Sequence, residues 1–247
     1  MLRSRVIPVL LVRDKGLVKT VKFKNDKYVG DPINAVRIFN EKEVDELIVL
    51  DIDATAQVKE PNYDLIENIA SECRMPLCYG GGVNNLDQIL KILSLGVEKV
   101  ALSAAPYDNE GLIEEAARRV GSQSIAVVLD VRKRRFGGYQ CMTHNATVAR
   151  KIEPVDYARK LANLGAGEII INSIDRDGTM SGYDTRIIQS INSAVPIPVT
   201  AVGGAGSMQD VRNLADKEGI IGCAAGSIFV FKGKYRAVLI NYQNLSQ

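Results

Sequence analysis

The sequence predicts a (β/α)8 barrel, in which eight parallel strands alternate with helices around one core. Short apolar runs alternate with segments of helical periodicity along all 247 residues. Runs such as 47–50 and 169–171 are apolar on both faces, as parallel strands covered by helices require. Much of the first half also recurs in the second half at a spacing of roughly 120 residues. We therefore expect one domain over residues 1–247, built from half-barrels at about 1–121 and 122–247.

The strands are predicted from the apolar runs, and the helices from the segments between them. The eight strands should begin near Val6, Leu47, Leu77, Val100, Ile125, Ile169, Val199 and Gly222. The clearest helical segment is 85–96, whose apolar stripe consists of Leu86, Ile89, Leu90 and Leu93. Asn85 can cap the start of this helix and Gly96 can close its end. Pro8 cannot donate a hydrogen bond in a ladder, so the extent of the first strand stays open.

Two connections that follow strand ends are long. Residues 13–30 follow the first strand and carry five lysines, and residues 132–147 follow the fifth strand as a polar loop around Gly137 and Gly138. Barrel active sites are built from the segments after the strands' carboxyl ends. We therefore expect these two loops to border the functional site.

Composition excludes several classes of protein. With 46% hydrophobic residues and a net charge of +2, the chain can bury a full core and gives no reason to expect nucleic acid. No stretch approaches a membrane span, and residues 1–5 lead into a strand rather than a signal peptide. The four cysteines form no Cys-x-x-Cys pair and lie in or beside apolar runs. We expect reduced, mostly buried thiols, a cytoplasmic location and no cofactor.

Glycine pairs at strand ends predict phosphate binding. Gly81 and Gly82 follow the third strand, and Gly203 and Gly204 follow the seventh. Ser103 after the fourth strand and Gly226 and Ser227 after the eighth complete two candidate sites. Without side chains, the backbone N–H groups can close on an anion; the alternative is that these glycines only form tight turns. Two sites on opposite sides of the mouth would select a long ligand phosphorylated at both ends.

Asp130 ends a hydrophobic strand, but its counterpart in the repeat is Leu11. A carboxylate at this position would face the mouth, where burial could raise its pKa toward general acid or base work. Alternatively, it is bonded to loop N–H groups. Four more carboxylates crowd the same rim, and some of them must orient loops: Asp51, Asp53, Asp175 and Asp177.

His144 is the only histidine and follows Cys141 by three residues. Two candidate ligands do not make a metal site, and one histidine gives little support to a histidine-activated nucleophile. We expect His144 to be a polar loop residue and the protein to have no metal site.

Four charged residues each stand immediately before an apolar strand: Arg5, Glu46, Lys99 and Glu168. Taken singly, each is a solvated charge at a strand end. Taken together, two positive and two negative side chains could form a ring that closes the barrel's bottom, because inward-facing charges must pair. The sequence leaves both interpretations open.

The runs at 5–8, 80–82, 165–168, 173–179, 181–184 and 203–206 resemble those of HisF, the cyclase subunit of imidazole glycerol phosphate synthase. In that family a glutaminase partner, HisH, supplies ammonia that travels through the barrel to a doubly phosphorylated ribulose substrate. The resemblance implies that the four strand-end charges form a salt-bridge gate for ammonia. It also implies that Lys19 lies on the mobile first loop and that Asp130 is one of two catalytic aspartates. The implied substrate and phosphate contacts are Lys19, Gly82, Ser103, Asp177, Gly178, Gly204, Gly226 and Ser227.

The chain departs from this family at its mouth. Leu11 occupies the position of the second catalytic aspartate, Ser103 and Ala104 replace Asn-Thr, and Val202 replaces a serine. An aliphatic side chain cannot transfer a proton, and losing one acid–base partner commonly costs about 10²–10⁴-fold in rate. A chain that keeps the gate residues but has an altered mouth resembles the HisF-like proteins of bacterial surface-polysaccharide clusters, the WbuZ type.

That second resemblance implies an enzyme subunit of lyase or amidotransferase type. It would work with a HisH-like glutaminase, and with a separate sugar amidotransferase, to make acetamidino sugars. Two alternatives remain. One is the imidazole glycerol phosphate synthase cyclase of histidine biosynthesis with a tolerated substitution. The other is a non-catalytic scaffold that activates a glutaminase.

Overall fold

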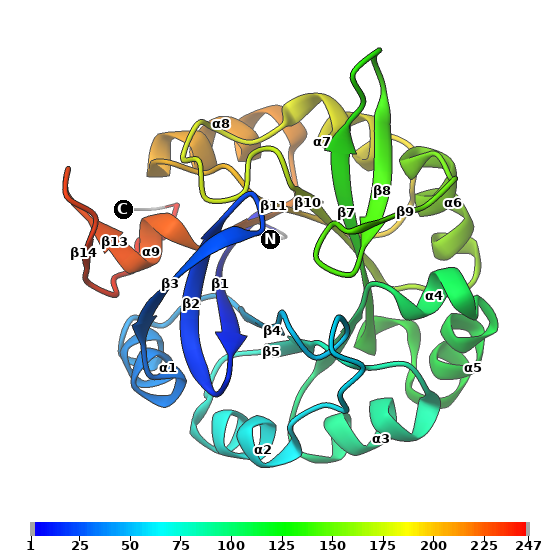
Figure 1. The fold of residues 1–247 in the computed structure, drawn as a ribbon, viewed down its shortest axis with the longest axis horizontal. Helices are drawn as coiled ribbons and strands as arrows, with labels where there is room; N and C mark the ends of the chain where they lie inside the picture. Colours follow the sequence, from blue (N-terminus) through cyan, green and yellow to red (C-terminus); the bar gives the residue numbers. More distant parts are fainter. Residues whose placement is uncertain (1–2, 246–247) are drawn as a thin grey trace.

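A computed structural model describes residues 3–245 and confirms the (β/α)8 barrel (Figure 1). The parallel strands follow one another around the barrel as β1 (Arg5–Arg13), β4 (Leu47–Asp51), β5 (Leu77–Gly80), β6 (Lys99–Leu102), β7 (Ile125–Lys133), β10 (Glu168–Ser173), β11 (Val199–Val202) and β12 (Gly222–Ala225). Strand β12 pairs in parallel with β1 and so closes the sheet on itself. Each predicted strand start lies at the observed start or next to it. Pro8 lies within β1, in register with Ala225.

Helices surround the barrel on its outside (Figure 1). They are α1 (Pro32–Glu41), α2 (Tyr63–Glu72), α3 (Leu86–Ser94), α4 (Ala105–Asp108), α5 (Gly111–Val120), α6 (Pro154–Asn163), α7 (Thr185–Asn192), α8 (Met208–Glu218) and α9 (Ser227–Val230), with a 3-10 turn, η1 (Ser122–Ser124). Helix α3 matches its prediction, because the Asn85 side chain accepts from the Gln88 N–H at its start. The single turn α9 leads into a short hairpin, β13 (Phe231–Lys232) and β14 (Ala237–Val238).

Apolar side chains form two separate cores, because successive strand residues point to opposite faces of the sheet. The larger core lies between the sheet and the helices and includes Leu10, Phe39 and Tyr157. The smaller core fills the inside of the barrel with Ile7, Val9, Ile48, Cys78, Ala101, Ala126, Val128, Ile170 and Ala224. The barrel interior is therefore lined mainly by hydrocarbon between its two ends.

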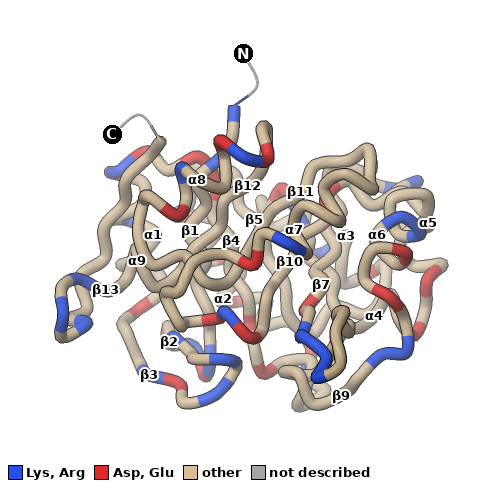
Figure 2. Tube along the Cα trace, turned by 90° about the horizontal axis from the view of Figure 1, so that it is seen from above, with Lys and Arg blue, Asp and Glu red and all other residues tan. Residues whose placement is uncertain are grey.

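The segments 13–30 and 132–147 lie at the mouth, as expected, but their description as loops is wrong. The first folds into a hairpin of β2 (Gly16–Val21) and β3 (Lys24–Gly30), and β2 pairs with the end of β1. In the second, β7 continues to Lys133 and pairs with β8 (Tyr139–Thr143), which pairs with β9 (Val148–Ala149). Strands β1 and β7 both extend past the barrel, so their backbone N–H and C=O groups can pair with the antiparallel strand that follows each of them. Figure 2 shows both hairpins at the same end of the molecule.

The two hairpins meet across the mouth. Phe23, between β2 and β3, packs against a cluster of Met142, Ala146 and Ile174. This contact joins the first half of the chain to the second outside the barrel itself.

All four cysteines are free, and Cys78, Cys141 and Cys223 are buried, in agreement with the expected reduced thiols. Within residues 3–245, no helix is both long and apolar enough to cross a membrane.

Candidate functional site

The carboxyl ends of the barrel strands surround a pocket of about 1310 Å³, a volume that includes space open to solvent. Its apolar part is lined by Val9, Leu11, Leu50, Ala101, Val128 and Val202. All the residues for which the sequence predicted catalytic, substrate or phosphate contacts also line it: Lys19, Gly82, Ser103, Asp130, Asp177, Gly178, Gly204, Gly226 and Ser227. The fold thus brings together residues from both half-barrels at one site.

Asp130 lies near the end of β7 with side-chain donors on both oxygens. The Asn172 amide donates to Oδ1 at 2.9 Å, and the Ser103 hydroxyl donates to Oδ2 at 3.3 Å. Loop N–H groups, the alternative considered above, are not its partners here. Burial raises the pKa of Asp130 to about 7, although both hydrogen bonds act to lower it. Asp130 can therefore exchange a proton near neutral pH.

Leu11 faces Asp130 across the barrel, because β1 and β7 are separated by three strands in either direction around the sheet. Leu11 packs with Leu50 and Val202 against the inner core. The mouth thus has a carboxylate on one side and hydrocarbon on the other. A second proton-transfer group is missing from the position where two-fold symmetry would place it.

The four other rim carboxylates all hold loops in place. Asp53 forms a bidentate pair with Arg13 at 2.9 and 2.8 Å. Asp51 accepts from the backbone N–H groups of residues 53 and 54, and Asp175 accepts from the N–H of Lys133. Asp177 accepts from the Thr20 hydroxyl at 2.8 Å and from the Phe23 N–H at 3.2 Å. Asp177 thereby ties the β2–β3 hairpin across the mouth.

Lys19 lies on β2, in a strand rather than in the loop expected from the sequence. Its side chain is buried, and Nζ donates to the Val9 carbonyl at 2.6 Å. Burial lowers its pKa to about 8, against the opposing effect of Asp177. A Cβ atom on Gly226 would overlap Lys19 Nζ, so glycine at this turn leaves room for the amine. Lys19 therefore places a basic group beside the turn after β12.

The glycine turns of the two half-barrels differ in the hydrogen-bond donors that they offer to an anion. On the first-half side, the Gly82 N–H already donates to Thr55 Oγ1 at 3.2 Å. On the second-half side, Gly204 has φ +113°, and a Cβ there would overlap the Gly182 carbonyl. Glycine is thus required for the conformation of this turn. Lys19 adds basic character on the second-half side only.

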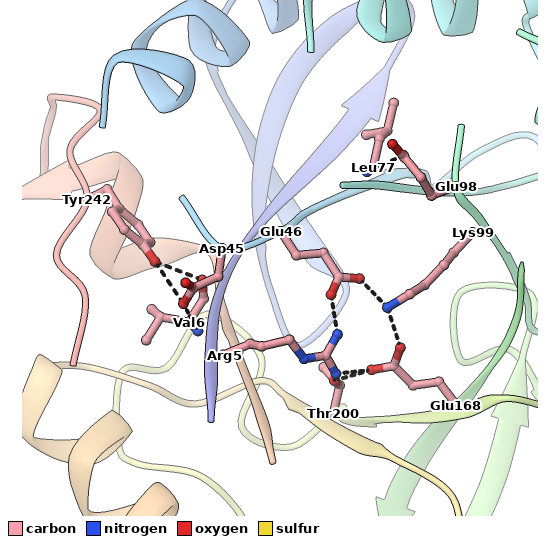
Figure 3. Close-up of polar contacts among 10 residues, drawn as sticks. All are labelled: Arg5, Val6, Asp45, Glu46, Leu77, Glu98, Lys99, Glu168, Thr200 and Tyr242. Carbon is pink, nitrogen blue, oxygen red and sulfur yellow. Dashed lines mark hydrogen bonds and ion pairs between the residues drawn. The ribbon is translucent and has the colours of Figure 1, made fainter. Parts of the chain in front are cut away.

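At the opposite end of the barrel, the four strand-end charges form one closed ring (Figure 3). Arg5 contacts both Glu46 and Glu168, the latter at 2.7 Å. Lys99 contacts the same two carboxylates at 2.7 Å each. The carboxylate side chains of Glu46 and Glu168 are only 4% and 6% exposed. Of the two interpretations left open by the sequence, the paired ring is the one that the structure shows.

Electrostatics within the ring favour the charged forms of Lys99, Arg5 and Glu168. Burial acts to lower the pKa of Lys99 and of Arg5, but Glu168 and Glu46 outweigh it and raise both pKa values. Burial acts to raise the pKa of Glu168, but Lys99 and Arg5 reverse this and lower it. The Thr200 hydroxyl adds a hydrogen bond to Glu168 at 2.5 Å. The ring is thus a polar layer below an apolar interior.

Several site residues were not recognised from the sequence, Asn172 and Thr200 among them. Asn172 aligns with Leu50 in the repeat, and Thr200 aligns with Cys78. Each is a polar residue in an apolar strand whose counterpart is less polar, which is the signal that identified Asp130. Comparison of the halves at every strand position would have found both.

His144 lies in the turn between β8 and β9, within the segment that was expected to border the site. It lines the mouth, and its Nδ1 is 3.1 Å from Thr143 Oγ1. It begins three successive residues, 144–146, with φ of 53°, 53° and 62°. Between residues 3 and 245, no group of three or more His, Cys, Asp or Glu side chains is arranged to hold a metal ion.

We expect Asp130→Asn to stabilise the fold above neutral pH. The pKa of Asp130 rises from an ordinary 3.8 to about 7 on folding. A group with a raised pKa in the folded state contributes stability at low pH and loses it as pH rises through the folded pKa. Asparagine does not ionise, so the stability gained by the variant should be about 2–3 kcal/mol larger at pH 8 than at pH 5. Urea unfolding at both pH values measures the difference.

The exposed Asp216 on α8 provides the control, since Asp216→Asn should leave the free energy of unfolding unchanged at either pH. An equal gain for Asp130→Asn at pH 5 and pH 8 would contradict ionisation as its cause.

Comparison with known proteins agrees with this geometry. A sequence model of the family described as "Histidine biosynthesis protein" matches residues 5–236. "Putative imidazole glycerol phosphate synthase subunit hisF3" of Vibrio vulnificus is 57% identical over 100% of this chain and 95% of its own length. The corresponding "subunit hisF2" of Pseudomonas aeruginosa is 53% identical over 100% and 98%. "Imidazole glycerol phosphate synthase subunit HisF" of Alkaliphilus metalliredigens is 39% identical over 85% and 83%. The chain therefore belongs to the HisF family of histidine biosynthesis proteins.

Proposed function

We propose that this HisF-like subunit receives ammonia from a HisH-like glutaminase and passes it through the barrel for the amidination of a sugar in surface-polysaccharide biosynthesis. The observation that carries the proposal is the contrast between the two ends of the barrel. The base keeps a complete ring of four paired charges. The mouth keeps Asp130 but has Leu11 opposite it.

The ring supports a passage rather than a simple structural plug. Burying four charges is costly, and well-packed hydrophobic side chains often replace such groups without loss of stability. Above the ring, the interior is lined by small and apolar side chains, among them Cys78, Ala126 and Ala224. Neutral ammonia can cross an apolar lining, whereas charged ammonium pays a large desolvation penalty there. The ring and its lining would together admit the neutral form.

The division of labour with a glutaminase rests on the cysteines. Burial raises the pKa of Cys73 and Cys141 to about 11 and that of Cys223 to about 12, and it also raises that of Cys78. A nucleophilic cysteine needs a lowered pKa, so none of these thiols suits glutamine hydrolysis. We therefore assign ammonia production to a separate HisH-like partner that docks at the base. A further enzyme, a sugar amidotransferase, would accept the nitrogen.

The second candidate function is cyclisation in histidine biosynthesis. It is favoured by the names of the three relatives described above, each of which reads imidazole glycerol phosphate synthase subunit, in two cases with the word "Putative" before it. The glycine turns that would hold a substrate phosphorylated at both ends are also present. A third candidate, a scaffold that only activates the glutaminase, would need neither the mouth pocket nor Asp130.

We expect the chain to lack appreciable cyclase activity on the doubly phosphorylated ribulose substrate, because Leu11 stands opposite Asp130 where a second catalytic carboxylate is needed. Saturating ammonium salt supplies nitrogen without the glutaminase, so product formation measures the cyclase step alone. Turnover should fall about 10²–10⁴-fold below that of an ordinary HisF protein assayed beside it. Leu11→Asp should recover part of the loss, whereas Leu11→Asn should not. Turnover comparable to the ordinary HisF protein would favour the histidine pathway instead.

We expect sulfate, as a phosphate analogue, to bind first near Gly204 and Gly226. The first-half site has Ala104 where the family offers a hydroxyl, and one neutral hydrogen bond is worth about 0.5–1.5 kcal/mol. Its Gly82 N–H is also already bonded to Thr55. Crystals grown at increasing sulfate concentrations measure the two occupancies. Lys19→Met should reduce the preference, and Lys15→Met, an exposed control on the same segment, should not. Equal or reversed occupancies would show the ranking to be wrong.

We expect Lys99→Leu to separate glutamine hydrolysis from nitrogen transfer. Arg5 and Thr200 still partner the two carboxylates, so the barrel should fold. In the complex with the glutaminase, glutamine should still be hydrolysed, but less of the released ammonia should reach the product. The reason is that the loss of Lys99 alters the ring through which ammonia would enter the barrel. Measuring glutamate and aminated product in the same reaction gives the ratio directly.

Lys217→Leu, on the exposed face of α8, is the matched control and should keep the parent ratio. If Lys99→Leu transfers nitrogen as efficiently as the parent, the passage is refuted and the activating scaffold becomes the better explanation.

A further inference from the structure

The hairpin of β7 and β8 carries a group of side chains that the proposed chemistry does not use. The end of β7 and the turn that follows it read Arg132, Lys133, Arg134, Arg135, Phe136, Gly137 and Gly138. Figure 1 shows the hairpin projecting away from the barrel, and Figure 2 shows its basic residues at the mouth end. Phe136 is 96% exposed, so it contributes nothing to the core.

The described part of the chain does not neutralise the charge at this tip. Lys133 pairs with Asp184 at 3.0 Å and anchors the base of the hairpin. No other member of the basic run forms an ion pair with the described residues, 3–245, and Arg135 lies over the Phe136 ring at 5.8 Å. The segment 131–140 contains no acidic residue. Arg134 and Arg135 are therefore exposed together with the aromatic ring of Phe136.

Arginine and aromatic side chains are the residues that most often carry binding energy at protein interfaces. Unpaired arginines complement carboxylates on a partner surface, and Phe136 would fill an apolar recess there. The base of the hairpin also fixes where such a partner lies. Asp130 is in register with Met142 on β8, so the hairpin rises directly from the catalytic strand at the edge of the pocket. A partner held by its tip would cover the mouth.

The chemistry of the mouth indicates which partner needs to be there. If the proposed function holds, nitrogen emerges beside Asp130, but Leu11 leaves the position opposite Asp130 without a second carboxylate. Ammonia released into water at neutral pH becomes ammonium, which is not a nucleophile. The enzyme that completes the amidination must therefore seal the opening. A lipid surface over the same opening would block the pocket without using the nitrogen.

We propose that the β7–β8 hairpin, through Arg134, Arg135 and Phe136, docks an acidic face of the nitrogen-accepting enzyme over the barrel mouth. This inference rests on the proposed function. The glutaminase would occupy the base of the same barrel and the acceptor enzyme its mouth, which places the two partners at the two ends of one passage.

The test reconstitutes nitrogen transfer from three purified proteins of the same organism: this chain, a HisH-like glutaminase and a sugar amidotransferase. Arg134→Glu combined with Arg135→Glu should lower glutamine-dependent product about tenfold or more. Product formed from added ammonium chloride, and glutamine hydrolysis itself, should stay at parent levels. Sedimentation should show loss of the complex with the amidotransferase, and the parent complex should weaken with rising salt. Phe136→Ser should weaken the complex without changing its salt dependence.

The second exposed basic hairpin supplies the matched control. Lys232→Glu combined with Lys234→Glu makes the same change of charge on β13–β14 and should leave transfer and complex formation at parent levels. Parent-like transfer by the Arg134 and Arg135 variant would overturn the docking inference while leaving the proposed function in place. If the parent chain transfers no nitrogen from glutamine, the proposed function fails and the inference with it. Binding to phosphatidylglycerol vesicles without any complex with the amidotransferase would overturn it in favour of a lipid surface.

Discussion

Closure of the parallel sheet, made by the pairing of β12 with β1, is the constraint on which the rest of the structure depends. Because all eight barrel strands run in one direction, their carboxyl ends meet at the mouth and their amino ends meet at the base. Asp130 and Leu11 are far apart in sequence yet face one pocket, and Glu46 and Glu168 share the same two cations. Local structure supplies the strands, but only closure brings these groups together.

The two ends treat buried charge in opposite ways. At the base, each carboxylate has two cationic partners, so the lowered pKa of Glu168 and the raised pKa of Lys99 maintain ionisation. At the mouth, Asp130 has only neutral donors, so burial dominates and its pKa rises to about 7. Glu168 and Lys99 at the base therefore stay ionised, whereas Asp130 at the mouth can exchange a proton near neutral pH. A buried residue whose pKa is strongly shifted, such as Asp130, is often part of a functional site.

The half-barrels have diverged at the positions that face the interior. Asp130 and Asn172 of the second half correspond to Leu11 and Leu50 of the first, and Thr200 corresponds to Cys78. These polar side chains form hydrogen bonds with carboxylates: Asn172 donates to Asp130, and Thr200 donates to Glu168. The first half contributes hydrocarbon to the same space. The carboxylate of Asp130 and its amide partner Asn172 therefore come from the second half, whereas Ser103 of the first half also donates to Asp130 and both halves contribute apolar lining.

The sequence by itself determined the strand order, the strand starts and the capped helix α3, because periodicity, capping and apolar runs act over a few residues. It also located Asp130 and the glycine turns, since strand ends in a barrel share one face. It could not establish that residues 13–30 and 132–147 are hairpins, because their pairing depends on β1 and β7 extending past the barrel. Nor could it choose between four solvated charges and one ring, or identify Asn172 as a partner of Asp130. Those outcomes depend on distances across a closed sheet, which only the tertiary structure sets.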